Sequence, residues 1–140
     1  MSRVINPDSA GKERTRLSKA IVLAIRQLAR QQGVTDLSRD LAAFIVLALQ
    51  RISAGIDVSV AAWEKRDYWV KADRFRMEWA WAETLGKKLE TALLADDWSN
   101  VAGVVAHIAA KLGKVKVSEK HRMGTPWTGA YRKYLDGANN

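Results

Sequence analysis

Nine consecutive apolar residues, Leu41 to Leu49, constrain this chain more than any other stretch of its sequence. A helix that is apolar on all sides is buried, because a surface helix keeps one polar face. The run is shorter than the roughly 20 apolar residues of a bilayer-spanning helix, and Asp40 and Arg51 lie close to its two ends. It therefore predicts the middle of a long central helix against which other helices pack.

The length and composition of the chain are those of one compact unit. A chain of 140 residues is long enough to bury a core without cross-links, so we expect a single domain, residues 1–140. The absence of cysteine excludes disulfides, thiol catalysis and cysteine-ligated zinc. The first seven residues lack the apolar stretch of a secretory signal, so we expect a cytoplasmic protein without membrane contact.

Apolar residues recur at helical spacing along most of the chain. The predicted helices cover residues 7–32, 36–66, 68–95, 97–112 and 126–135, with a basic extended connector at residues 113–125. Asn6 before Pro7 is a start signal for the first helix, and Gly33 is a stop signal. Thr35 or the residue after it caps the second helix.

The boundary between the second and third helices is read from the phase of their apolar stripes. Ile52 and Ile56 stay in phase across Gly55, so we expect no break there but a close contact with a neighbouring helix. The stripe of the third helix is about 110° out of phase with that of the second. The chain must therefore turn near Asp67.

Short connections favour antiparallel neighbours. The predicted fold is all-α: an up-and-down antiparallel four-helix bundle with a short fifth C-terminal helix packed on it. The fourth helix would be only about 24 Å long against about 40 Å for the others, which leaves part of the core uncovered. The fifth segment carries Trp127, Ala130 and Tyr134 on one face, and we expect that face to cover the gap.

Positive charge is concentrated at the two ends of the chain, whose net charge is +8. Residues 1–33 hold seven Lys or Arg against two acids, and residues 96–140 hold seven against four. On the first helix the cations form a stripe roughly 160° from the apolar stripe, interrupted only by Leu23. The stripe consists of Lys12, Arg16, Lys19, Arg26 and Arg30.

Antiparallel helices would bring cations from four helix ends to the same pole of the bundle. The predicted pole consists of Lys12, Arg14, Arg16, Lys65, Arg66, Lys71, Lys111, Lys114 and Lys116, and Lys120 and Arg122 extend it into the connector. One interpretation is a footprint for nucleic-acid phosphates or another polyanion. The other is a solvated surface that keeps a small protein soluble. No motif for base-specific recognition is present.

The third helix carries a second apolar face, about 140° from its core stripe. This candidate partner surface consists of Trp69, Val70, Met77 and Trp81. Exposed aromatic residues of this kind often mark an interface. The alternative is burial under another segment of the same chain.

No sequence motif indicates catalysis. The chain lacks a Glu-x-x-His pair, a nucleophile elbow and a phosphate loop, so we expect no enzyme activity, no metal and no cofactor. The expected function is sequence-nonspecific binding of DNA or RNA backbone through the basic stripe, pole and connector. The alternative is a protein-interaction or structural subunit, either a homo-oligomer or one bound to an acidic protein partner.

Overall fold

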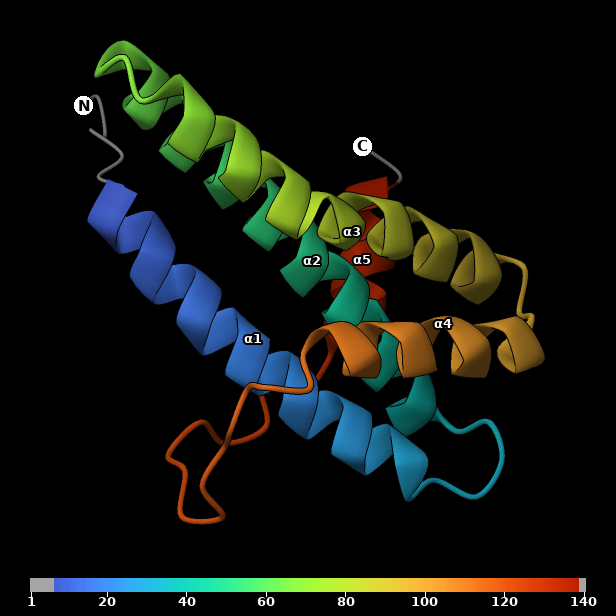
Figure 1. The fold of residues 1–140 in the computed structure, drawn as a ribbon. Coiled ribbons are helices and arrows are strands. Elements are labelled where there is room, and N and C mark those ends of the chain that lie inside the picture. The colour runs from blue at the N-terminus through green and yellow to red at the C-terminus, as the bar shows by residue number, and fades with distance from the viewer. Residues whose placement is uncertain (1–6, 139–140) are drawn as a thin grey trace.

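The computed structural model of this chain describes residues 7–138, which form five α-helices and no β-strand. The helices are α1 Pro7–Ala29, α2 Asp36–Lys65, α3 Trp69–Leu94, α4 Trp98–Lys111 and α5 Ala130–Ala138 (Figure 1). The predicted all-α class and the number of helices are confirmed. The predicted cap of α1 at Asn6 lies outside the described residues.

The start of α2 follows directly from its capping residues. Ser38 N donates to Thr35 Oγ1 at 3.1 Å, and Thr35 N donates to Ser38 Oγ at 3.3 Å. This reciprocal pair satisfies two backbone N–H groups that the first helical turn leaves open. The predicted start at Thr35 or Asp36 is therefore confirmed.

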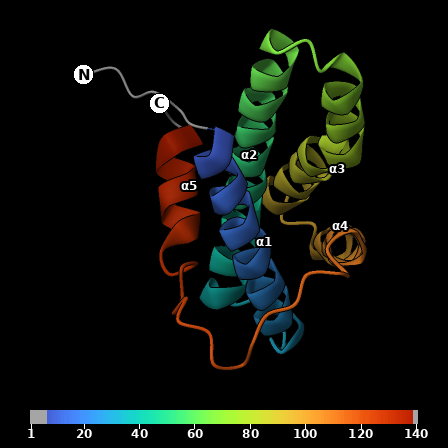
Figure 2. The same ribbon diagram turned by 60° about the vertical axis from the view of Figure 1, so that its left-hand side comes forward.

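α2 is the central helix, and α1, α3 and α5 pack against it (Figures 1 and 2). In its apolar run, Leu41, Ile45 and Leu49 have no measurable exposure. α2 and α3 approach closely where Gly86 faces α2, because a Cβ at Gly86 would lie 3.4 Å from Leu49 Cβ. The apolar run Leu41 to Leu49 thus forms the centre of the core.

α1, α2 and α3 alternate in direction, and α4 runs back along the second half of α3 but across α1 and α2. Figure 2 shows α4 end-on, while α1 and α2 run along the height of the same view. α4 packs on the second half of α3 and ends beside its middle, where Lys111 is close to Trp81 and Leu85. The end of α4 is therefore far from the turn between α2 and α3, contrary to the expected pole.

The predictions for Gly55 and Asp67 agree with the structure. α2 passes through Gly55 without a break, and a Cβ there would lie 3.7 Å from Ala10 Cβ of α1. The turn between α2 and α3 contains Asp67 with a positive φ of 62°. That left-handed conformation ends α2 and reverses the chain into α3.

α2 is also long and apolar enough to cross a bilayer, by length and composition alone. Half of the 18-residue apolar stretch of α2 that could span a bilayer is buried inside the molecule. The central helix of a helical core has the same apolar character, because neighbouring helices cover it on several sides.

α5 docks on α2, as predicted, but it starts at Ala130 and not at residue 126. Gly129 has a φ of 76°, which ends the preceding turn before the helix begins. Trp127 is buried ahead of α5 and meets Phe44 of α2 edge to face, with ring centroids 6.4 Å apart. Asp40 accepts hydrogen bonds from Gly129 N and Tyr131 N at 3.1 and 3.0 Å.

Tyr134 closes the same interface on its other side. Its hydroxyl donates to Glu90 Oε2 of α3 at 2.7 Å. Burial, together with this hydrogen bond to a carboxylate, raises the pKa of Tyr134 well above its ordinary value. The C-terminal helix is therefore held by aromatic packing and by directed polar contacts.

Candidate functional site

The connector between α4 and α5 lies along the basic face of α1. A groove of about 400 Å³ separates the two segments, with Lys12, Arg16 and Lys19 on the α1 side. The connector contributes His121 and Arg122 on the other side. We call these five residues, drawn from segments about 100 positions apart in the sequence, the basic groove.

Apolar side chains of the connector explain why it lies on α1. Val117 and Met123 line the groove and pack against the core. Burial of these two side chains therefore holds the connector beside a face of α1 that is otherwise charged.

Among residues 9–137, whose side chains the structure describes, the cations of the basic groove have no acidic partner. Ion pairs form elsewhere: Arg51 with Glu13 at 2.8 Å, for example, and Lys87 with Glu83 at 3.0 Å. Lys12, Arg16, Lys19 and Arg122 take part in none of the ion pairs that the structure describes. Their charges therefore remain available for an anionic ligand.

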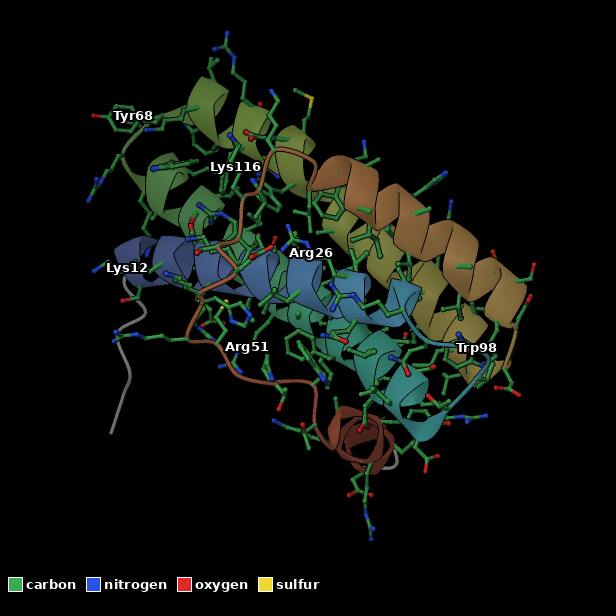
Figure 3. All side chains as sticks on the ribbon, turned by 90° about the horizontal axis from the view of Figure 1, so that it is seen from below. Lys12, Arg26, Arg51, Tyr68, Trp98 and Lys116 are labelled. Carbon is green, nitrogen blue, oxygen red and sulfur yellow. The ribbon has the colours of Figure 1, made fainter. Side chains whose placement is uncertain are left out.

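Local hydrogen bonds shape the connector beside the groove. Met123 N donates to His121 Nδ1 at 3.2 Å, which leaves Nε2 to carry the proton of the neutral ring. Lys120 N donates to Ser118 Oγ at 3.1 Å. Lys114, Lys116 and Lys120 are exposed along the same segment. Figure 3 shows Lys12 and Arg26 on α1 and Lys116 on the connector.

Arg14 belongs to the helix-packing interface and not to the basic groove. Its guanidinium lies over the rings of Phe75 and Trp79, at 4.7 and 5.6 Å from the ring centroids. Burial lowers the pKa of Arg14, and the charge of Glu78 opposes that shift. The sequence could have indicated this position, because Arg14 lies three positions before the buried Leu17 and so on the same face of α1.

The predicted pole divides into separate groups. Lys65, Arg66 and Lys71 lie at the turn between α2 and α3, whereas Lys111 lies beside the middle of α3. Arg26 and Arg30 are exposed further along α1. The structure thus brings together the early part of the α1 stripe and the connector, but it does not bring all fourteen predicted cations to one place.

A second hollow lies at the turn between α2 and α3, with a volume of about 970 Å³. Its lining includes Trp63, Tyr68, Trp69, Lys71, Arg74 and Phe75, which we call the aromatic pocket. Trp63, Phe75 and Arg74 are not among the site residues predicted from the sequence. Only the turn at Asp67 brings these residues to one hollow.

The candidate partner surface is exposed only in part. Trp69, Val70 and Met77 are 55%, 69% and 72% exposed, so they are not buried under another described segment. Trp81 is half-buried and stacks on Trp79, with ring centroids 5.6 Å apart. Intramolecular burial therefore holds for Trp81 and not for the other three.

The residues that the structure describes contain no group of three or more metal-ligating side chains. Comparison with protein-family models, with curated proteins and with solved structures finds no significant match to this chain.

Proposed function

We propose that this protein binds the phosphate backbone of nucleic acids through the basic groove, without sequence specificity and without catalysis. The observation that carries the proposal is the convergence of Lys12, Arg16, Lys19 and Arg122 on one groove with no carboxylate partner among the described residues. Unpaired cations on a shared surface bind polyanions by releasing their condensed counterions.

The geometry of the groove supports a backbone and not a small anion as ligand. Lys12, Arg16 and Lys19 span two turns of α1, about 10 Å at 1.5 Å per residue. Arg26 and Arg30 continue the same stripe for about 16 Å beyond Lys19. A row of this length matches a succession of phosphates, and nothing in it reads base edges.

The scaffold is part of the same proposal. The alternation of α1, α2 and α3 supports a four-helix bundle whose short fourth helix runs back along the second half of the third and across the first two. In this arrangement the connector must return from the end of α4 to α5 over α1. The bundle thereby sets the path that places His121 and Arg122 opposite the α1 stripe.

The test is the salt dependence of binding, measured by fluorescence anisotropy with a labelled 20-base-pair duplex. The variant carries Lys12→Gln, Arg16→Gln, Lys19→Gln and Arg122→Gln. If each cation neutralises one phosphate, the slope of log K against log salt falls by about 0.9 for each, so by about 3.6 in all. Affinity at low salt falls with it.

The matched control removes four charges elsewhere, with Lys87→Gln, Lys88→Gln, Arg132→Gln and Lys133→Gln on α3 and α5. These residues are exposed and lie outside the groove. The control keeps the wild-type slope to within about one unit if binding is local. Equal losses in both variants would show that net charge alone, and not the groove, attracts nucleic acid.

The alternative function, a self-associating or protein-binding subunit, is favoured by the exposure of Val70 and Met77. Analytical ultracentrifugation tests it directly. A dimer that Val70→Asp and Met77→Asp convert to a monomer supports this function. A monomer at high concentration, unchanged by both substitutions, counts against self-association.

A further inference from the structure

The aromatic pocket combines flat apolar surfaces with cations that have no ion-pair partner. Trp69 and Tyr68 are 55% and 54% exposed, so one face of each ring remains open to a ligand. Trp63 and Phe75 meet edge to face at 4.8 Å and form the more buried part of the lining. Exposed rings beside a hollow provide surfaces on which a planar ligand can stack.

The charges around the pocket favour a ligand that carries phosphate. Lys71 Nζ lies 4.7 Å from the centroid of the Trp63 ring, and Arg74 is exposed on the next turn of α3. Neither takes part in an ion pair that the structure describes. Lys65 and Arg66 add two exposed cations at the end of α2.

Two carboxylates also line the pocket, Asp67 and Glu78. Their charges reduce the local positive potential, but carboxylate oxygens accept hydrogen bonds from the exocyclic amino groups of bases. The pocket therefore offers ring faces for a base, cations for its phosphate and acceptors for its amino group.

An anionic lipid surface is a poorer match to the same features. Lys65, Arg66 and Asp67 occupy the tip of the turn, so inserting the tip would take three charges out of water, which is costly. The aromatic side chains line a hollow and do not form a convex apolar wedge. The shape and the charges at the tip thus favour a ligand that enters the protein.

We infer that the aromatic pocket receives an unpaired nucleobase, with its phosphate on Lys71 and Arg74, so that the protein binds a single strand more tightly than a duplex. The inference rests on the proposed function and specifies its ligand. Bases in a duplex are already stacked on each other, whereas those of a single strand are free to stack on aromatic side chains.

The beginning of α1 links the pocket to the basic groove. The beginning of α1 and the turn between α2 and α3 are both near the top in Figures 1 and 2, whereas the connector, the other wall of the groove, lies lower in both. Phe75 lines the pocket, and Arg14 covers its ring from α1, on the side of that helix opposite Lys12 and Lys19. α1 therefore stands between the pocket and the cations of the groove.

The test compares a labelled 15-nucleotide single strand with a 15-base-pair duplex, by fluorescence anisotropy at one salt concentration. We expect Trp69→Ala to weaken single-strand binding about fivefold or more, since the loss of one stacked base costs at least that order of affinity. Duplex affinity should stay within about twofold. Trp69→Phe should retain most of the single-strand affinity because it keeps a ring.

Leu94→Ala is the matched control, because Leu94 is 55% exposed at the end of the same helix but does not line the pocket. It should leave both affinities unchanged, and thermal melting should show that each variant is folded. Equal losses with single strand and duplex, or no loss with Trp69→Ala, would overturn the inference and leave the proposed function standing.

Two further binding measurements distinguish the single strand from other ligands. A nucleoside monophosphate that binds as tightly as the 15-nucleotide strand would contradict the single-strand assignment and indicate a free nucleotide. Vesicles containing phosphatidylserine that bind the wild type but not Trp69→Ala, with no single-strand preference, would also overturn it. If the variant with the four groove cations replaced loses binding and Trp69→Ala does not, the result would support the proposed function and contradict the role of the pocket.

Discussion

The C-terminal part of the chain crosses the helical core twice, and the two crossings differ in how their polar groups are satisfied. At the α5 interface, Asp40 accepts two backbone hydrogen bonds and Glu90 accepts the Tyr134 hydroxyl. At the basic groove, Lys12, Arg16 and Lys19 have no acidic partner among the described residues. The C-terminal part of the chain thus makes one interface whose polar groups are paired and one whose cations have no described partner.

The difference also extends to packing. Trp127, Ala130 and Tyr134 are each about 5% to 6% exposed where α5 lies on α2. In the connector, Val115, Val117 and Met123 are only half-buried. Because stability follows buried apolar area and satisfied polar groups, α5 should contribute to the stability of the fold, whereas the connector should contribute mainly to binding.

The largest effect should come from removing the aromatic anchor of α5. Trp127→Ala should lower the free energy of unfolding by about 3 to 5 kcal/mol, through lost burial and the cavity left against Phe44. Urea denaturation followed by circular dichroism measures it. Trp69→Ala, at an exposed position, should change it by less than about 0.5 kcal/mol. Similar losses in both would show that α5 is not an anchor.

The next effect concerns the polar contacts of Asp40. Asp40→Ala leaves the backbone N–H groups of Gly129 and Tyr131 without their acceptor, at a cost of about 1 to 3 kcal/mol. Asp57→Ala, an exposed residue of the same helix with no described ion pair, is the matched control. Hydrogen exchange of α5 should rise in the first variant and not in the second.

The stability that Tyr134 contributes at the α5 interface should depend on pH. Its folded pKa is raised, so the stabilisation is fully present below the unfolded pKa of about 10 and is lost as the pH rises above it. Tyr134→Phe should lower stability by about 1 kcal/mol at neutral pH. It should also make the alkaline loss of stability shallower than in the wild type. If stability falls equally with pH above 10 in the wild type and in Tyr134→Phe, protonation of Tyr134 does not contribute to stability.

The smallest effect is expected in the basic groove. Each of Lys12→Gln, Arg16→Gln and Lys19→Gln should change the free energy of unfolding by less than about 0.5 kcal/mol, because exposed unpaired cations add little to stability. Thermal melting at low salt measures it. A loss of several kcal/mol in the triple variant would show that these cations support the fold, and the contrast between the two crossings would disappear.

Much of the fold follows from local sequence rules. The period of the apolar residues predicts the helices, and their capping residues predict where they start, as at Thr35. The phase break predicts the turn at Asp67, and the continuous stripe predicts an unbroken helix through Gly55. These features depend on interactions between residues only a few positions apart, which the sequence displays directly.

The candidate sites required the tertiary structure. An antiparallel arrangement was expected to place Lys111 beside Lys71, but α4 has 14 residues against 26 in α3, so it ends with Lys111 beside the middle of that helix. Arg14 was grouped with the surface cations, but its guanidinium lies over the rings of Phe75 and Trp79. Which helix faces meet depends on how side-chain ridges interlock between elements, which no local pattern specifies.

By itself, the sequence determined an all-helical chain around Leu41 to Leu49, with a fifth segment whose aromatic face must find a partner. The tertiary structure alone decided that the connector crosses α1, so that His121 and Arg122 face Lys12, Arg16 and Lys19. The physical reason is one of range. Helices form from contacts within a few residues, whereas a binding surface needs the relative placement of segments about 100 residues apart.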